Sequence, residues 1–198
     1  SRYIDFVIPG LLGMNIMAGG IWGLGFAIVE ARRRNLLKRL VSTPMSRANY
    51  LASFLFSRFV FLLVEVVVIL GRAVLLFGVP VRGSLVQLGA VSIVSALAFG
   101  GIGLLIASRA KTTEGVSGLM NLVMMPMWVL SGVFFSSTNF PAPAQPFIQA
   151  LPLTATINAL RGTMLQGVGW SGVSVPMLIV GVWGVLAFGV ALKVFRWR

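Results

Sequence analysis

Five long apolar runs constrain this chain more than any other feature. They cover Phe6–Val29, Leu51–Gly78, Leu85–Ala107, Val116–Phe135 and Val173–Leu192. An α-helix needs about 20 apolar residues to cross the hydrocarbon core of a bilayer. An outer-membrane β-barrel would instead give short segments of alternating polarity. The runs therefore predict an all-α, polytopic helical membrane protein with five spans in this chain.

Charged residues are too scarce for a soluble fold. They make up 10% of the chain, whereas soluble domains carry about 25%. The net charge of +12 comes from Lys and Arg that cluster at the ends of the apolar runs, which is a topology signal of helical membrane proteins. We therefore expect membrane lipid, and no nucleic acid, as a partner. The sequence has neither Cys nor His, so it lacks the commonest parts of metal sites and of nucleophilic catalysis.

The distribution of Lys and Arg predicts the orientation. Eleven of them flank the runs on the side of residues 30–50, 108–115 and the C-terminal tail, and three (Arg2, Arg82 and Arg161) lie on the other side. Because basic loops stay in the cytoplasm, this bias places the loop and the C-terminus there and Ser1 outside. We therefore expect a multi-pass protein of the bacterial inner (plasma) membrane. An outside start predicts an earlier span, and so a parent with six spans.

The stretch Glu30–Tyr50, EARRRNLLKRLVSTPMSRANY, is the most basic part of the chain. Its leucines recur at helical spacing opposite its basic residues, and Pro44 ends the pattern. One interpretation is a solvated basic loop that fixes topology and attracts anionic lipid. The other is a short amphipathic helix that docks in the groove of a partner.

Three charged residues interrupt the second run at intervals of seven: Arg58, Glu65 and Arg72. Seven residues are nearly two helical turns, so the three share one stripe. Charges at membrane depth are costly and should face protein or water. The stripe can be a structural anchor for Glu65. Alternatively, it can be the proton or cation site of an ion-gradient-driven secondary transporter or channel.

Other polar, glycine and methionine positions also have two interpretations. Gly19 and Gly23 form a GxxxG pair, which favours close helix packing in lipid, either within one subunit or on a dimer or substrate face. Asn15 is expected to bond a neighbouring helix more readily than a ligand. The methionines around Pro126 can be core, or an adaptable surface for hydrophobic substrates. The candidate substrate path comprises Asn15, Met120, Asn121, Met124, Phe134 and Phe135.

Residues 136–171 are apolar and rich in proline, yet they lie on the predicted external side. A helical stripe follows Pro152, formed by Leu153, Ile157, Leu160 and Met164. This helix is too short to span a bilayer. The segment therefore predicts an external re-entrant helical hairpin, with Arg161 near the outer surface.

Three pieces together resemble a known family. They are EARRRNLLKRLVSTPMSRANYL, PMWVLSGVFFSSTNFP and PLTATINALRG. In this combination the chain is similar to the membrane (permease) subunit of ABC exporters of the drug-resistance and polysaccharide type, the ABC type 2 family. The resemblance covers residues 1–198 as one transmembrane domain that lacks the family's first span.

The resemblance implies a half-transporter that pairs with a second permease copy or a paralogue. Each permease would dock one ATP-binding cassette subunit, which would hold ATP and Mg, so this chain would carry no cofactor and would not be an enzyme by itself. The substrate would be hydrophobic or amphipathic: a drug, a lipid or a glycan-like molecule. Residues 30–50 would be the coupling loop, and residues 136–171 would form the external gate region. The implied coupling residues are Glu30, Arg33, Arg34, Leu36, Leu37, Leu40, Thr43 and Pro44.

Overall fold

The computed structural model describes residues 3–33, 44, 47–78, 81–108, 110, 112–133 and 136–194. Every regular element in this part of the chain is a helix, as the sequence predicts. The long helices are α1 (Tyr3–Arg33), α3 (Arg47–Phe77), α4 (Leu85–Ala107), α5 (Thr113–Leu130) and α8 (Trp170–Val194). The short elements are η1 (Ser137–Asn139), η2 (Ala142–Ala144), α6 (Gln145–Ala150), α7 (Pro152–Arg161) and the π-helical turn η3 (Gly162–Gln166).

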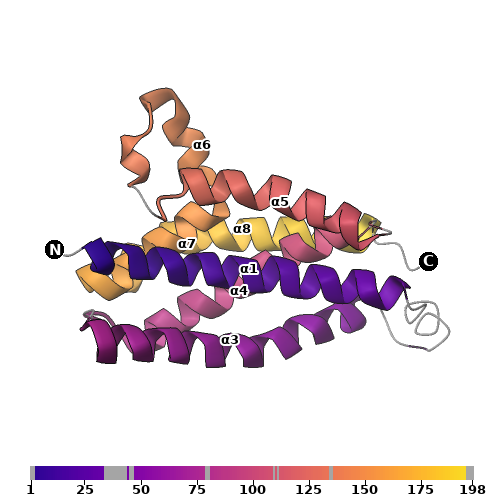
Figure 1. Cartoon of the computed structure of the whole chain (residues 1–198), viewed down its shortest axis with the longest axis horizontal. Coiled ribbons are helices and arrows are strands. Elements are labelled where there is room, and N and C mark those ends of the chain that lie inside the picture. Colours follow the sequence, from indigo (N-terminus) through magenta and orange to yellow (C-terminus); the bar gives the residue numbers. More distant parts are fainter. Residues whose placement is uncertain are drawn as a thin grey trace.

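The five long helices form one bundle in which successive helices run in opposite directions (Figure 1). In that view α1 crosses the middle, α3 follows the lower edge and α5 the upper edge. Helix α4 packs against both α1 and α8 and is the most buried of the candidate spans. The end of the bundle at which α1 begins is called its N-terminal end below.

Local sequence explains where several helices begin and end. Ser84 precedes α4 and its Oγ accepts from the backbone N–H of Val86 and Gln87 at 3.2 and 3.4 Å. Thr112 caps α5 in the same way, accepting from Gly115 N–H at 3.0 Å, so both caps satisfy N–H groups that lack a partner inside the helix. Gly78 follows α3 with a φ of 63°, a left-handed conformation that favours glycine.

Glycines set how closely α4 approaches its two neighbours. A Cβ at Gly103 of α4 would lie 2.8 Å from the Ile21 carbonyl oxygen of α1. A Cβ at Gly184 of α8 would lie 3.0 Å from the Cα of Ala98 on α4. Lipid tails are as apolar as the side chains, so close backbone packing replaces the hydrophobic effect as the attraction between such helices.

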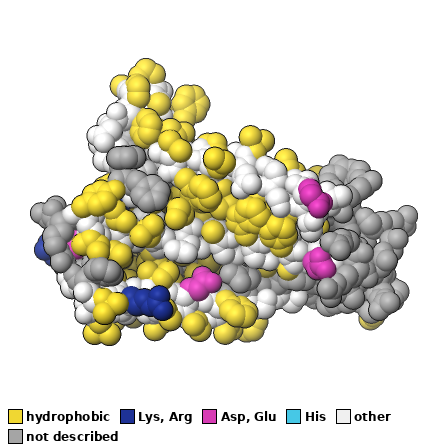
Figure 2. All heavy atoms as spheres, in the orientation of Figure 1, with side chains coloured by type: hydrophobic (Ala, Val, Ile, Leu, Met, Phe, Trp, Pro, Cys, Tyr) yellow, Lys and Arg dark blue, Asp and Glu magenta, His cyan; other side chains and the backbone are white. Residues whose placement is uncertain are grey.

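The surfaces of α3 and α8 are largely apolar and face away from the bundle. Phe56 and Leu75 on α3, and Leu178 and Leu186 on α8, are all more than half exposed. The face in Figure 2 also carries hydrophobic side chains across its middle and few charged ones. Such surfaces are stable when the surrounding solvent is hydrocarbon.

Four helices are long and apolar enough to cross a membrane: α1, α3, α4 and α8. The fifth expected span, Val116–Phe135, corresponds to α5, which ends at Leu130 after 18 residues. The count of five spans therefore stays a prediction. Helix α1 is longer than the expected Phe6–Val29. It begins at Tyr3, and its last turn includes Glu30 and the basic residues that follow it.

The segment 136–171 forms a pair of short helices, α6 and α7, followed by η3. In Figure 1, α6 stands away from the bundle, whereas α7 lies against it. The predicted apolar stripe of α7 is confirmed as core, since Leu153, Ile157, Leu160 and Met164 are all fully buried. Whether the hairpin is re-entrant in a bilayer stays a prediction.

Candidate functional site

The expected coupling residues lie at the helix ends that flank residues 34–46. Glu30 and Arg33 belong to the last turn of α1, so they are helical rather than part of a loop. Likewise α3 begins at Arg47 and includes Tyr50. Residues 30–33 and 47–50 at the two ends of the expected loop Glu30–Tyr50 are therefore helical. Pro44 is an exposed bend. The remaining candidates, Arg34, Leu36, Leu37, Leu40 and Thr43, lie outside the described residues.

Asn15 lies on the most exposed stripe of α1. Its Nδ2 donates to the carbonyl of Leu11 on the same helix at 2.9 Å, rather than to a neighbouring helix as expected. Farther along this stripe the rings of Trp22 and Phe26 stack with centroids 4.9 Å apart. The stripe thus offers one polar group and a stacked aromatic pair on an otherwise apolar face.

The methionines of the candidate path pack inside the bundle. Met120 and Met124 are fully buried, and the end of Met120 fills the space beside Gly25 of α1. Their placement favours the core interpretation over a substrate surface. Asn121 is exposed on α5, and Phe134 and Phe135 lie outside the described residues. Of the six candidates, the structure thus leaves Asn15 and Asn121 on the surface.

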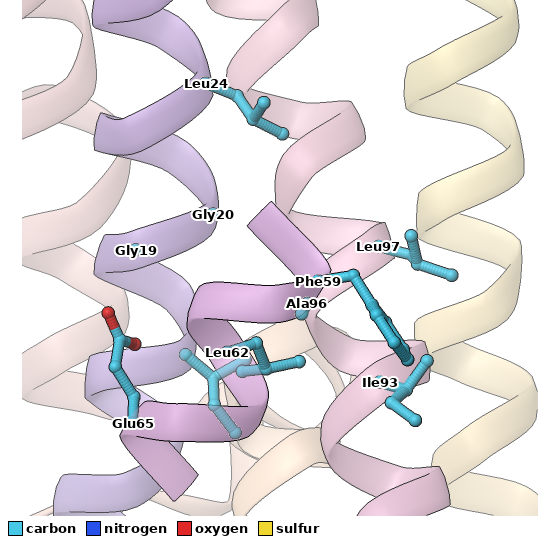
Figure 3. A pocket seen from close by; sticks show the side chains of 10 residues that line it. Gly19, Gly20, Leu24, Phe59, Leu62, Glu65, Ile93, Ala96 and Leu97 are labelled. Atoms are coloured by element: carbon cyan, nitrogen blue, oxygen red, sulfur yellow. The ribbon is translucent and has the colours of Figure 1, made fainter. Parts of the chain in front are cut away.

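Glu65 lines a cavity of about 20 Å³ between α1, α3 and α4, room for about one water molecule. Figure 3 shows its carboxyl group on the side of Gly19, whereas Phe59 and Ile93 lie on the opposite side. Glu65 is half-buried and Arg72 is exposed. Residues seven apart are about 10 Å apart along a helix axis. The side chain of the third member of the stripe, Arg58, lies outside the described part of the structure.

Polar contacts tie the hairpin to the long helices. Gln87 of α4 donates from Nε2 to Thr163 Oγ1 at 2.9 Å, and Thr156 of α7 donates to Ser95 Oγ at 3.2 Å. At the junction of α6 and α7, the Ala150 carbonyl accepts from Trp183 Nε1 at 2.7 Å. Trp183 is 13 residues into α8, or about 20 Å along its axis. The junction between α6 and α7 therefore lies some way along the bundle axis, away from its N-terminal end.

Arg161 joins three elements at the N-terminal end of the bundle. Its Nε and Nη2 donate to the Phe6 carbonyl of α1 at 3.2 and 2.9 Å, and Nη2 also donates to the Gly132 carbonyl after α5 at 2.6 Å. The guanidinium stands 3.7 Å from the centroid of the Phe6 ring. Burial lowers the pKa of Arg161 to about 10, so the side chain remains charged at pH 7.

Sequence reasoning placed Arg161 near the outer surface but did not assign it a role. The available signal was its position as a single basic residue within an apolar segment. Arginine presents several donors in a rigid fork, which suits it to binding two carbonyls at once. Its partners are backbone groups brought together by the fold, so the sequence could not name them.

A family model described as "ABC-2 type transporter" matches residues 2–165. The chain belongs to the ABC-2 type transporter family. The match includes residues 30–50, α5 and the hairpin through α7 and most of η3. Together with the apolar helices, the family identifies a multi-pass protein of the inner membrane.

Three relatives illustrate the range of this ABC-2 family. The chain is 26% identical over 194 residues to ABC transporter G family member 20 of Dictyostelium discoideum, covering 97% of this chain and 27% of that protein. It is 24% identical over 194 residues to the probable multidrug ABC transporter permease YbhS of Escherichia coli K12, covering 97% and 50%. It is 27% identical over 203 residues to the inner membrane transport permease YadH of the same strain, covering 98% and 73%. The chain thus spans half or less of the first two relatives and about three-quarters of the third.

Proposed function

We propose that this chain forms the membrane path of an ATP-driven exporter, as a permease subunit that does not itself hydrolyse ATP. The observation that carries the proposal is a bundle of apolar helices that belongs to the ABC-2 family, one relative of which is named a probable multidrug ABC transporter permease. The 198 residues contain no GxxxxGK[ST] phosphate loop, the element with which many ATPases cradle ATP. In this proposal an ATP-binding cassette subunit holds ATP and Mg.

The energy enters through residues 30–50. Helices α1 and α3 each have 31 residues, or about 46 Å of helix, and they flank residues 34–46 directly. A displacement of this segment by the ATP-binding subunit would move the ends of two long helices. In the amphipathic helix that the sequence predicts here, Leu36, Leu37 and Leu40 would supply the apolar face to be buried, and the basic residues would orient it.

The substrate path lies on the exposed face of α1 and α5, completed by a second permease copy or a paralogue. Support comes from Asn15 and Asn121, which are exposed on these neighbouring helices. Trp22 and Phe26 extend the α1 stripe with a stacked aromatic surface. Such a face suits a hydrophobic or amphipathic substrate better than an ion, because apolar area would supply most of the binding free energy.

Substitution of the apolar face of the coupling segment tests this function. In Leu37→Glu and Leu40→Glu, a carboxylate would be desolvated in the partner's groove, at a cost of at least a few kcal/mol. We expect loss of co-purification of the ATP-binding subunit and of substrate-stimulated ATPase activity in the reconstituted complex. Asn35→Glu is the matched control, because it adds the same charge on the opposite side of the predicted helix. Unchanged partner binding and stimulation in the folded leucine variants would refute the coupling role, and transport driven by an ion gradient without ATP would refute the exporter.

A further inference from the structure

The end of α5 is held against α1 and α7 by one guanidinium. Arg161, the last residue of α7, donates to the Phe6 carbonyl in the second turn of α1 and to the Gly132 carbonyl just after α5. Gly132 has a φ of 82°, which turns the chain sharply and aims this carbonyl back toward the bundle. The same cation therefore bridges two helices that are far apart in the sequence.

A second contact at this point depends on the absence of a side chain. A Cβ at Gly10 of α1 would lie 2.8 Å from the Val133 carbonyl oxygen and 3.1 Å from its Cα. The backbone after α5 thus rests directly on the backbone of α1. A Cβ at Gly10 would also lie 3.2 Å from Arg161 Nη2, so the glycine leaves room for both the guanidinium and the backbone after α5.

The closed arrangement also leaves polar groups without partners. The Ser131 Oγ, the Trp128 Nε1 and the Thr154 Oγ1 are buried, and none has a hydrogen-bond partner within the described residues. Trp128 lies on the last turn of α5, Ser131 is its C-cap, and Thr154 lies on α7. Buried polar groups without partners destabilise the state that contains them. Separation of the end of α5 would give Ser131 and Trp128 access to water.

Helix α7 is bound to α1 in a different way. Ile157, which is fully buried, lies so close to Gly13 that a Cβ there would be 2.9 Å from its Cγ1. The rest of the α7 stripe is equally buried. Apolar interlocking of this kind holds α1 and α7 together as one unit.

We propose that Arg161 is a positioning residue that clamps the end of α5 to the α1–α7 unit, and that release of this clamp opens the N-terminal end of the substrate path. The clamp itself follows from the contacts above, whereas its release during transport rests on the proposed export function. The closed state is stabilised by the guanidinium and the glycine contact, and it is destabilised by the two buried polar groups of α5 without partners, Trp128 and Ser131. A balance of this kind allows the two states to interconvert.

Cysteine labelling tests the clamp, because the chain has no native cysteine. Ser131→Cys is the reporter, since Ser131 is 1% exposed and lies beside Gly132. In full-length protein in nanodiscs, we expect a hydrophilic maleimide to label it at least about tenfold faster when Arg161→Gln is added, and faster also with Gly10→Ala. Arg161→Lys should be intermediate, because a lysine keeps the charge but loses the fork.

A second reporter separates a clamp from a general structural role. Ser92→Cys lies on α4 and is 2% exposed, so it should stay protected in the Arg161→Gln background. Protection of both reporters, or equal labelling of both, would overturn the clamp. In the complex with the ATP-binding subunit, trapping with ATP and vanadate should change the labelling of Ser131→Cys with Arg161 intact. If ATP has no effect while Arg161→Gln still exposes the reporter, the clamp stands and its role in transport is overturned. If no ATP-binding subunit co-purifies, the proposed function fails independently.

Discussion

Gly103→Ala should weaken the contact between α1 and α4. The added Cβ would lie 2.8 Å from the Ile21 carbonyl oxygen, 2.9 Å from the Ile21 Cα and 3.0 Å from the Gly20 carbonyl oxygen. All three are backbone atoms, so no side chain can rotate away. Ordinary contact begins near 3.4 Å, so α1 would have to move by about 0.6 Å.

Overpacking of this size costs typically 1–3 kcal/mol. Alanine recovers about 0.5–1 kcal/mol of helix stability relative to glycine. The expected net loss is therefore about 1–2 kcal/mol, or a factor of about 5–30 in the unfolding equilibrium. Titration of the purified protein from mild detergent into SDS, followed by tryptophan fluorescence, measures this loss as a lower midpoint.

Gly89→Ala is the matched control, since Gly89 is on the same helix and a Cβ there would meet nothing within 4 Å. It should be neutral or slightly stabilising. In addition, the losses of stability caused by Gly20→Ala and Gly103→Ala should not be additive. A Cβ at Gly20 would lie 2.9 Å from Phe99 Cβ, across the same contact between α1 and α4. Once the first methyl group has pushed α1 and α4 slightly apart, the second methyl group has room. The double variant should therefore lose less stability than the sum of the two single variants. Equal stability of Gly103→Ala and Gly89→Ala would refute this reasoning.

Three further predictions concern orientation and polar groups. A cysteine at Asn35 should be labelled by an impermeant reagent only after the cells are opened, and labelling of intact cells would reverse the predicted topology. Because Glu65 lines the cavity between α1, α3 and α4, Glu65→Ala should lower stability or assembly without changing the pH dependence of transport. A folded variant that loses proton-coupled uptake would instead support a secondary transporter. Gln87→Ala should destabilise the hairpin by about 1–3 kcal/mol, because Thr163 Oγ1 loses a buried donor, and adding Thr163→Val should recover part of this loss in the same SDS titration.

Much of the fold follows directly from the order of apolar and charged residues. Long runs without charge form helices in lipid because each backbone N–H and C=O then finds its partner inside the segment. Four of the five predicted spans meet the criteria of length and composition. The stripe of α7 was also predictable, since apolar residues at helical spacing indicate a buried face. The structure adds that most of the remaining residues of α7 are buried as well.

The site residues were harder to predict, because a membrane helix shows little contrast between its faces. Lipid and neighbouring helices are both apolar, so Met120 and Met124 could equally have faced either one. The structure buries both and places the end of Met120 beside Gly25 of α1. Residues 34–43, which carry most of the predicted coupling residues, lie outside the described part of the structure.

The sequence by itself determined that the chain is a helical membrane protein of the ABC-2 type, since solvent preference and local motifs are written residue by residue. Only the tertiary structure decided which glycines carry the helix crossings and what Arg161 binds. The sequence pointed to Gly19 and Gly23, whereas Gly103 of α4 packs on the backbone at Gly20 and Ile21. Arg161 binds two backbone carbonyl groups, a kind of group that every residue has. Backbone groups are identical along the chain, so only their positions in space make two of them a binding site.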